Sequence, residues 1–174
     1  MKKNVLVCGV IGGLITTVMF IITTAITLKG GTVEHGAIYG YTSMILAFSP
    51  IFVGVKNVRD GYDSGVISFA KAFKIGLYIT LIASSIYVIS WLFDYYFFLT
   101  GFAEQYSAHV LEKLRASGAS AAEIAKKTAE MADFTKMYKN PFFNAMITYT
   151  EILPVGLIVS LISALVLKRK VAKV

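Results

Sequence analysis

Four long apolar stretches divide this 174-residue chain, and they constrain its fold more than any other feature. They run approximately over residues 5–28, 37–55, 73–99 and 142–167. A helix needs about 20 mostly apolar residues to cross a bilayer, and any other open backbone would leave N–H and C=O groups unpaired there. The pattern therefore predicts an all-α integral membrane protein, with four transmembrane helices in one membrane domain that covers residues 1–174.

The composition agrees with this prediction and argues against several other classes of protein. The chain is 56% hydrophobic and 16% charged, with a mean hydropathy of +0.69, which exceeds what a water-soluble core of this size needs. The net charge of +7 falls in short clusters between apolar runs, so we expect no nucleic-acid partner. Cys8 is the single cysteine, and His35 and His109 lack neighbours at metal-ligand spacing. We therefore expect no disulfide, no metal and no cofactor.

The distribution of charge predicts how the helices are oriented. The N-terminus, the second loop and the C-terminal tail together hold ten cations and two anions. The rest of the chain holds seven cations and eight anions. The positive-inside rule then places both termini and the second loop in the cytoplasm.

The connector over residues 100–140 falls on the outer side, and its sequence is typical of amphipathic helices. Gly118 offers a stop for a first helix. Ser120 and Glu123 have the spacing of a capping box that begins a second one. Glu123 is also four residues before Lys127, so we expect these two to form an ion pair on the helix surface.

The second loop is predicted to contain turns and then a membrane anchor. Residues 55–65 are typical of turns, and Ser68 can cap the helix that follows. Ile67, Phe69 and Phe73 are expected to lie in the membrane interface, where nearby lysines meet anionic lipid head groups. Membrane lipids are therefore expected partners, and the loop is a possible docking site for a cytoplasmic protein.

Two carboxylates lie inside the predicted spans and are the strongest candidates for a functional site, because an ionisable group in a bilayer costs about 2.5–3.5 kcal/mol. Asp94 is about 8 Å from a helix end and can reach interfacial water. Glu151 is about 14 Å deep, so it must be protonated, paired or in a wet cavity. Pro154 cannot donate a hydrogen bond to the carbonyl of Thr150, and Tyr149 completes a local polar site.

This intramembrane polar site has two interpretations. In the first, it is a proton or cation relay, or a carboxylate that binds a ligand. In the second, Glu151 is protonated or hydrogen-bonded and fixes helix packing through a tyrosine or serine on the third helix.

Small residues recur at a spacing of four, which favours close helix packing either within the chain or between copies. The candidate packing residues are Gly9, Gly13, Gly36, Gly40, Gly156, Ser160 and Ala164.

Five segments resemble the signature of the domain of unknown function 4199 family. They cover residues 43–48, 52–56, 67–76, 138–141 and 151–156. The resemblance extends over nearly the whole chain and implies a bacterial four-helix membrane protein, located here in the inner membrane. The family carries no established activity, so the resemblance implies no catalytic residue.

We therefore expect a non-enzymatic accessory or assembly subunit that binds partners through its outer helical segment and its small-residue faces. The partner is a second copy or another membrane protein. The alternative is a proton- or ion-coupled transporter or channel subunit that uses Glu151. A third hypothesis is a membrane-embedded lipid-modifying enzyme, for which Asp94 and Glu151 are the only catalytic candidates.

Overall fold

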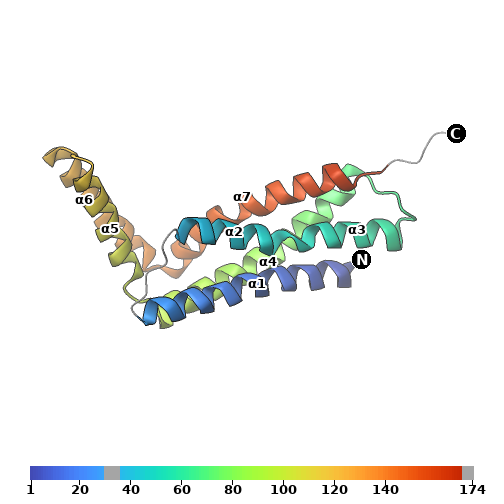
Figure 1. The fold of residues 1–174 in the computed structure, drawn as a ribbon, viewed down its shortest axis with the longest axis horizontal. Coiled ribbons are helices and arrows are strands. Elements are labelled where there is room, and N and C mark those ends of the chain that lie inside the picture. The colour runs from blue at the N-terminus through green and yellow to red at the C-terminus, as the bar shows by residue number, and fades with distance from the viewer. Residues whose placement is uncertain (30–35, 170–174) are drawn as a thin grey trace. The chain divides into compact units, whose positions relative to one another are not determined.

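The protein is built from helices (Figure 1). The computed structural model describes residues 1–29 and 36–169. The helices in these residues are α1 (Lys2–Leu28), α2 (Gly36–Phe48), α3 (Pro50–Tyr62), α4 (Phe69–Phe97), α5 (Phe102–Ala116), α6 (Ala121–Tyr138) and α7 (Pro141–Leu167). No strand occurs in these residues beyond an isolated antiparallel bridge between Ile67 and Arg169.

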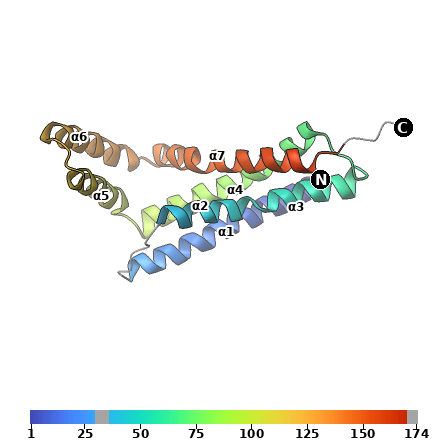
Figure 2. The same cartoon turned by 45° about the horizontal axis from the view of Figure 1, so that its top comes forward.

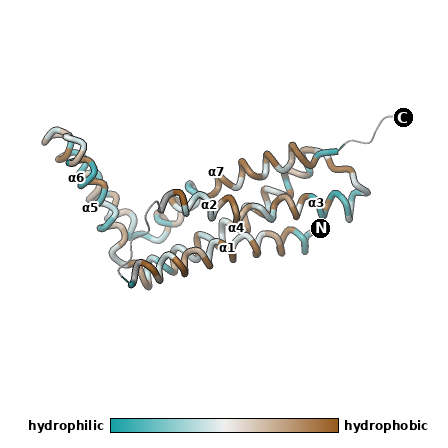
Figure 3. The backbone as a smooth tube through the Cα atoms, viewed as in Figure 1, coloured by the Kyte–Doolittle hydropathy of each residue, from teal (hydrophilic) through white to brown (hydrophobic). Residues whose placement is uncertain are grey.

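Four helical segments are long and apolar enough to cross a membrane, which confirms the predicted fold class. They are Lys2–Ile26, Ile38–Tyr62, Phe69–Phe97 and Pro141–Leu167. In Figure 3 hydrophobic residues extend along these segments, whereas hydrophilic residues gather near the ends of α3 and α7. Many large apolar side chains are exposed on the spans, such as Ile21 and Ile89 at 63% and 66%. Lipid contact accounts for such a surface on a multi-pass membrane protein.

The chain forms two compact units. Unit 1 consists of Met1–Trp91 with Thr148–Val174, and unit 2 consists of Leu92–Ile147. Unit 1 therefore contains α1, α2, α3, most of α4 and most of α7. Figures 1 and 2 show these segments of unit 1 lying alongside one another as a bundle. Unit 2 holds the end of α4, the α5–α6 hairpin and the first turns of α7.

The second span of unit 1 is interrupted where α2 meets α3. Pro50 has no N–H, so it cannot donate to the carbonyl of Leu46, four residues earlier. The backbone N–H and the hydroxyl of Ser49 donate to that carbonyl instead, at 3.1 and 2.7 Å. The helix therefore ends at Phe48 and restarts at Pro50. The sequence analysis predicted one continuous span over 37–55 and did not predict this break.

Helix α3 also extends further than predicted. Residues 55–65 were expected to form turns, but the helix continues to Tyr62. The reason is a buried face: Val55 and Val58 are fully buried, and Arg59 is buried one turn after Val55. The guanidinium of Arg59 donates to the carboxylate of Asp60 at 2.6 Å, which gives this cation a partner near the helix end.

The segment between α3 and α4 connects to the end of α7. The N–H of Ile67 donates to the carbonyl of Arg169, and the N–H of Arg169 donates back, at 3.2 and 2.9 Å. Ile67 is buried under this bridge, so its side chain packs inside the protein, and its place at the depth of the membrane interface stays a prediction. Ser68 caps α4 as predicted, because its hydroxyl accepts from the N–H of Lys71 at 3.3 Å.

In unit 2, α5 and α6 are the two helices predicted for the connector, and they pack against each other as a hairpin. Gly118 lies just beyond α5 with a φ of 77°, a conformation that glycine adopts without strain. The capping box at the start of α6 is complete, since the N–H of Glu123 donates to the hydroxyl of Ser120 and the carboxylate of Glu123 accepts from Ser120. This use of Glu123 explains why the predicted pair with Lys127 is absent: Lys127 instead donates to Glu130 at 2.9 Å.

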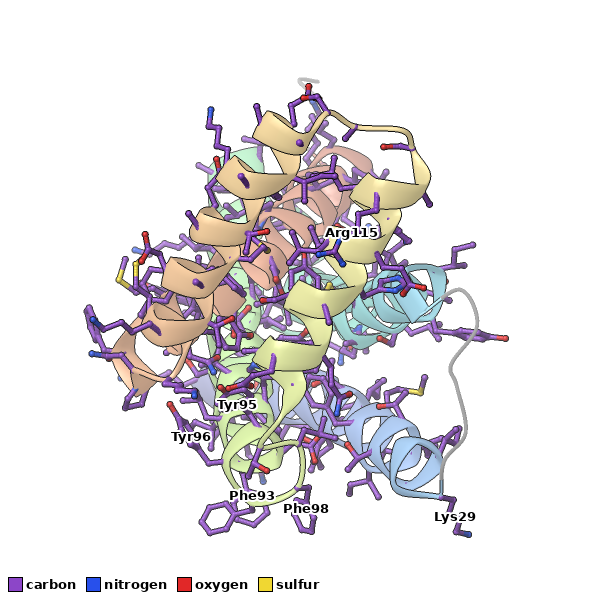
Figure 4. All side chains as sticks on the ribbon, turned by 90° about the vertical axis from the view of Figure 1, so that its left-hand side faces the viewer. Lys29, Phe93, Tyr95, Tyr96, Phe98 and Arg115 are labelled. Carbon is purple, nitrogen blue, oxygen red and sulfur yellow. The ribbon has the colours of Figure 1, made fainter. Side chains whose placement is uncertain are left out.

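Polar and aromatic contacts hold the base of the hairpin together. Lys139 donates to Glu104 at 2.8 Å, and this hydrogen bond lowers the pKa of the Glu104 carboxyl and raises the pKa of Lys139. The hydroxyl of Tyr96 donates to the carbonyl of Lys139 at 2.8 Å. Tyr95 packs edge-on against Tyr138. Figure 4 shows Tyr95 and Tyr96 in unit 2, where their contacts join the end of α4 to the end of α6.

Candidate functional site

The site begins with helix α7, whose start is set by a local cap. The side-chain oxygen of Asn140 accepts from the N–H of Phe142 at 2.9 Å, and Pro141 occupies the first helical position, where its missing N–H has no cost. Within unit 1, α7 then presents one buried stripe at a spacing of four residues. The stripe consists of Thr148, Ile152, Gly156, Ser160 and Ala164.

This buried stripe packs against α4 through small residues. The hydroxyls of Ser160 and Thr80 share a hydrogen bond of 3.0 Å. Gly156 lies so close to Thr80 that a Cβ there would overlap the Thr80 methyl group, and the Phe48 ring is 2.8 Å away. A Cβ at Gly76 would likewise meet Ser160 at 2.8 Å. The three predicted packing residues of α7, including Ala164, therefore face the inside of unit 1.

Of the other predicted packing glycines, Gly9 and Gly13 lie against another helix, whereas Gly40 does not. A Cβ on Gly9 would lie 2.7 Å from the Cβ of Ile82, and one on Gly13 would lie 2.5 Å from that of Ile86. The Gly9 and Gly13 face of α1 is therefore occupied by α4 of the same chain. Gly40 has nothing within 4 Å of an added Cβ. Gly36 begins α2, and its surroundings lie outside the described part of the chain, as does His35.

Glu151 is on the exposed side of α7, away from the buried stripe. Thr150 and Pro154 are exposed on the same side. In the residues that the structure describes, Glu151 has no hydrogen bond and no ion pair. The carboxylate is therefore exposed and has no polar partner on another helix in the described part of unit 1.

One interpretation of Glu151 was a hydrogen bond to a tyrosine or serine on the third span. In the structure Tyr149, and not Glu151, makes such a contact. Its hydroxyl donates to the hydroxyl of Ser85 at 2.9 Å, and Ser85 in turn donates to the carbonyl of Leu81 at 2.8 Å. This chain of hydrogen bonds fixes α7 to α4 and leaves Glu151 out.

Asp94 lies in the other unit. It is 8% exposed, near the end of α4, and its backbone carbonyl accepts from the N–H groups of Phe98 and Leu99 at 2.9 Å each. The carboxylate is thus largely shielded, although its distance from the helix end predicted contact with interfacial water. Nearby aromatic rings face outward: Phe93 and Phe98 lie with their centroids 5.9 Å apart, and Figure 4 shows both at this end of α4.

A family model for a protein of unknown function (DUF4199) matches residues 8–169. The chain belongs to the DUF4199 family. No curated protein and no solved structure matches it significantly. This agrees with the resemblance inferred from the sequence, and it adds no residue roles to those that the geometry gives.

Several buried polar residues of this DUF4199 protein were not singled out from the sequence. Asn144 is fully buried in unit 2, where its amide donates to the carbonyl of Tyr138 at 3.4 Å. Ser84 and Ser163 are fully buried in unit 1, and neither hydroxyl has a hydrogen-bond partner in the described residues. A single hydroxyl in an apolar run is too common to stand out, although Asn144, three residues after Pro141, could have been recognised as an amide within a span.

The arrangement limits what chemistry the site can perform. In unit 1, as far as it is described, Glu151 is the only acidic residue between the two ends of the bundle, and no three His, Cys, Asp or Glu residues gather to hold a metal ion. An exposed carboxylate without a neighbouring base or acid is suited to binding rather than to proton transfer through the bundle.

Proposed function

We propose that the chain is a non-enzymatic accessory or assembly subunit of the bacterial inner membrane, which acts by binding another membrane protein. The observation that carries this proposal is the exposed Glu151 on α7, which has no partner within the described residues. A carboxylate without a partner in lipid costs free energy and stabilises no contact within the described chain. The presence of Glu151 at this position therefore favours a role in binding another protein.

The binding surface differs from the one that the sequence favoured. The Gly9–Gly13 face and the Gly156–Ser160 stripe are filled by α4 of the same chain, so they are not free for a partner. The exposed face of α7 is the proposed binding surface instead. The α5–α6 hairpin, which exposes acidic and basic side chains on both helices, is a second region for contacts outside the membrane.

The proposed orientation places both termini in the cytoplasm. In Figure 1 the start of α1, the α3–α4 turn and the end of α7 lie at one end of unit 1. Lys3 is in the first turn of α1, Lys71 is in the first turn of α4, and Lys168 directly follows α7. Their clustering supports a cytoplasmic location for this end.

A transporter function finds less support. A proton or ion path through unit 1 would need further polar or ionisable groups at successive depths. The buried polar groups in the described part of unit 1 are mainly small hydroxyls: Thr80 and Ser160 bond to each other, whereas Thr16 and Ser43 bond to carbonyls of their own helices. A lipid-modifying enzyme would have to combine Asp94 and Glu151, which belong to different units.

The accessory role is tested by deleting the gene and by purifying the full chain from native membranes. We expect one membrane protein to copurify at fixed stoichiometry, and its assembly or abundance to fall in the deletion strain. Purified protein in liposomes should show no pH-driven flux. A flux that Glu151→Gln abolishes without loss of folding would instead establish the transporter function.

A further inference from the structure

The exposed face of α7 is uniformly apolar except around Glu151. Toward the end of the helix it presents Leu157, Ile158, Leu161, Ile162, Leu165 and Val166, which are 38–68% exposed. The opposite stripe of α7 is already packed against α4, so this face is free for another helix. One carboxylate therefore lies on a wide apolar surface.

Glu151 lies well inside the hydrocarbon. It is ten residues after Pro141 and sixteen before Leu167, which corresponds to about 15 Å and 24 Å along the helix axis. A hydrocarbon core of about 30 Å leaves this position several ångströms from either interface. A charged group at such a depth is stabilised mainly by an opposite charge or by hydrogen-bond donors.

The described part of unit 1 offers no cation at this depth. The Ser160–Thr80 hydrogen bond fixes the level of α7 against α4, and Glu151 is nine residues further toward the outer end. Lys74 lies six residues from Thr80 in the opposite direction. Lys71, the other cation of α4, lies further still in that direction, and neither residues 75–91 of α4 nor the interior of α1 contains a lysine or arginine.

A second copy of the chain would not supply the missing charge. Copies with the same orientation in a membrane are related by an axis along its normal, so equivalent residues lie at equal depth. Glu151 would then meet neutral side chains or the second Glu151. Two ionised carboxylates facing each other repel, and a symmetric contact would have to protonate at least one of them, so charge complementarity favours a partner that carries a cation.

We propose that the exposed face of α7 binds a transmembrane helix of a different membrane protein, and that this helix brings a lysine or arginine to the depth of Glu151. The inference rests on the proposed accessory function and specifies its partner. The apolar residues from Leu157 to Val166 supply the packing surface. The ion pair at Glu151 supplies the selectivity, because a helix without a cation leaves the carboxylate uncompensated.

The test is photo-crosslinking in native membranes with the full chain. A photoreactive phenylalanine analogue replaces Ile158, which is 58% exposed on the α7 face, and in a control it replaces Leu14, 54% exposed on α1. Mass spectrometry then identifies the crosslinked segment. The experiment is repeated with Glu151→Gln, which keeps the shape, and with Glu151→Asp, which keeps the charge.

We expect crosslinks from position 158, and not from position 14, to a transmembrane helix that contains a lysine or arginine. Polar contacts between membrane helices contribute about 0.6–1.7 kcal/mol, so Glu151→Gln should reduce capture roughly 3- to 20-fold, and Glu151→Asp should largely restore it. Capture of a helix without a cation, or no effect of Glu151→Gln, overturns this inference but leaves the accessory function standing. Crosslinks only to lipid or to a second copy overturn both.

Discussion

Replacing Gly156 with alanine should weaken the contact between α7 and α4 in unit 1. The new methyl group would overlap the side-chain methyl of Thr80, and the Cζ atom of Phe48 would be 2.8 Å away. Phe48 is fully buried, and Thr80 is held by its hydrogen bond to Ser160, so neither can move away without disturbing other contacts.

The expected size of the effect follows from two opposing terms. Alanine in a helix interior is favoured over glycine by about 0.5–1 kcal/mol. Inserting a methyl group into a packed core costs about 1–3 kcal/mol. Gly40→Ala is the matched control, since an added Cβ there meets nothing within 4 Å and only the favourable term applies. The two variants should therefore differ by about 1–3 kcal/mol, or roughly 5- to 150-fold in the folding equilibrium.

The measurement is unfolding of both variants and the wild type by denaturing detergent in mixed micelles, followed by circular dichroism or tryptophan fluorescence. A second variant identifies the cause. Thr80→Ser removes the overlapping methyl group and keeps the hydroxyl that bonds to Ser160. In combination with Gly156→Ala it should recover part of the lost stability, with a coupling of about 0.5–3 kcal/mol. Equal stabilisation by Gly156→Ala and Gly40→Ala would refute the close approach of α7 and α4.

Three further predictions concern local interactions. Ser120→Ala removes the capping box of α6 and should cost about 1 kcal/mol, measured as faster amide exchange in the first turn of that helix. Glu104→Gln should remove part of the acid-side pH dependence of thermal unfolding. Lys139 lowers the pKa of Glu104 in the folded state, so the contribution of this pair is present at neutral pH and is lost as the pH falls through that lowered pKa. Ser160→Ala should cost about 0.6 kcal/mol in the micelle assay through loss of its hydrogen bond to Thr80.

Each of these predictions has a control in the same chain. Ser117→Ala, at the end of α5, should leave exchange at the start of α6 unchanged, and an equal effect would contradict the cap. Glu112→Gln, exposed on α5, should preserve the pH dependence that Glu104→Gln removes. Thr80→Val combined with Ser160→Ala should cost less than the sum of the single variants, and strict additivity would argue against the shared hydrogen bond.

Helix spans and helix caps, which depend on residues that are close in sequence, could be predicted from the sequence. The four spans follow from long apolar runs, and Ser68 and Ser120 cap helices whose first turns are adjacent in the chain. These features depend on backbone hydrogen bonds within a few residues, so no knowledge of distant contacts is needed. The error over residues 55–62 has the opposite origin, because burial of Val55 and Val58 against other helices overrides a turn-like composition.

The direction in which Glu151 faces was harder to predict. Apolar residues surround most of α7, so hydropathy does not distinguish the lipid side from the protein side. The small residues carry a clearer signal: the stripe of Gly156, Ser160 and Ala164 extends backward to Ile152 and Thr148, not to Glu151. Steps of four residues along that stripe are visible in the sequence alone, and they place the carboxylate on the outside of the bundle.

The division of unit 1 into two stretches of sequence has a consequence during synthesis. Thr148–Val174 leaves the ribosome only after the roughly 56 residues of Leu92–Ile147. At about 5–20 residues per second this delay is about 3–11 s. During that interval Gly76 and Thr80 lack the helix that later covers them, and the chain is most exposed to wrong helix pairing. The bridge between Ile67 and Arg169 can form only at the end, so it marks the completion of the bundle.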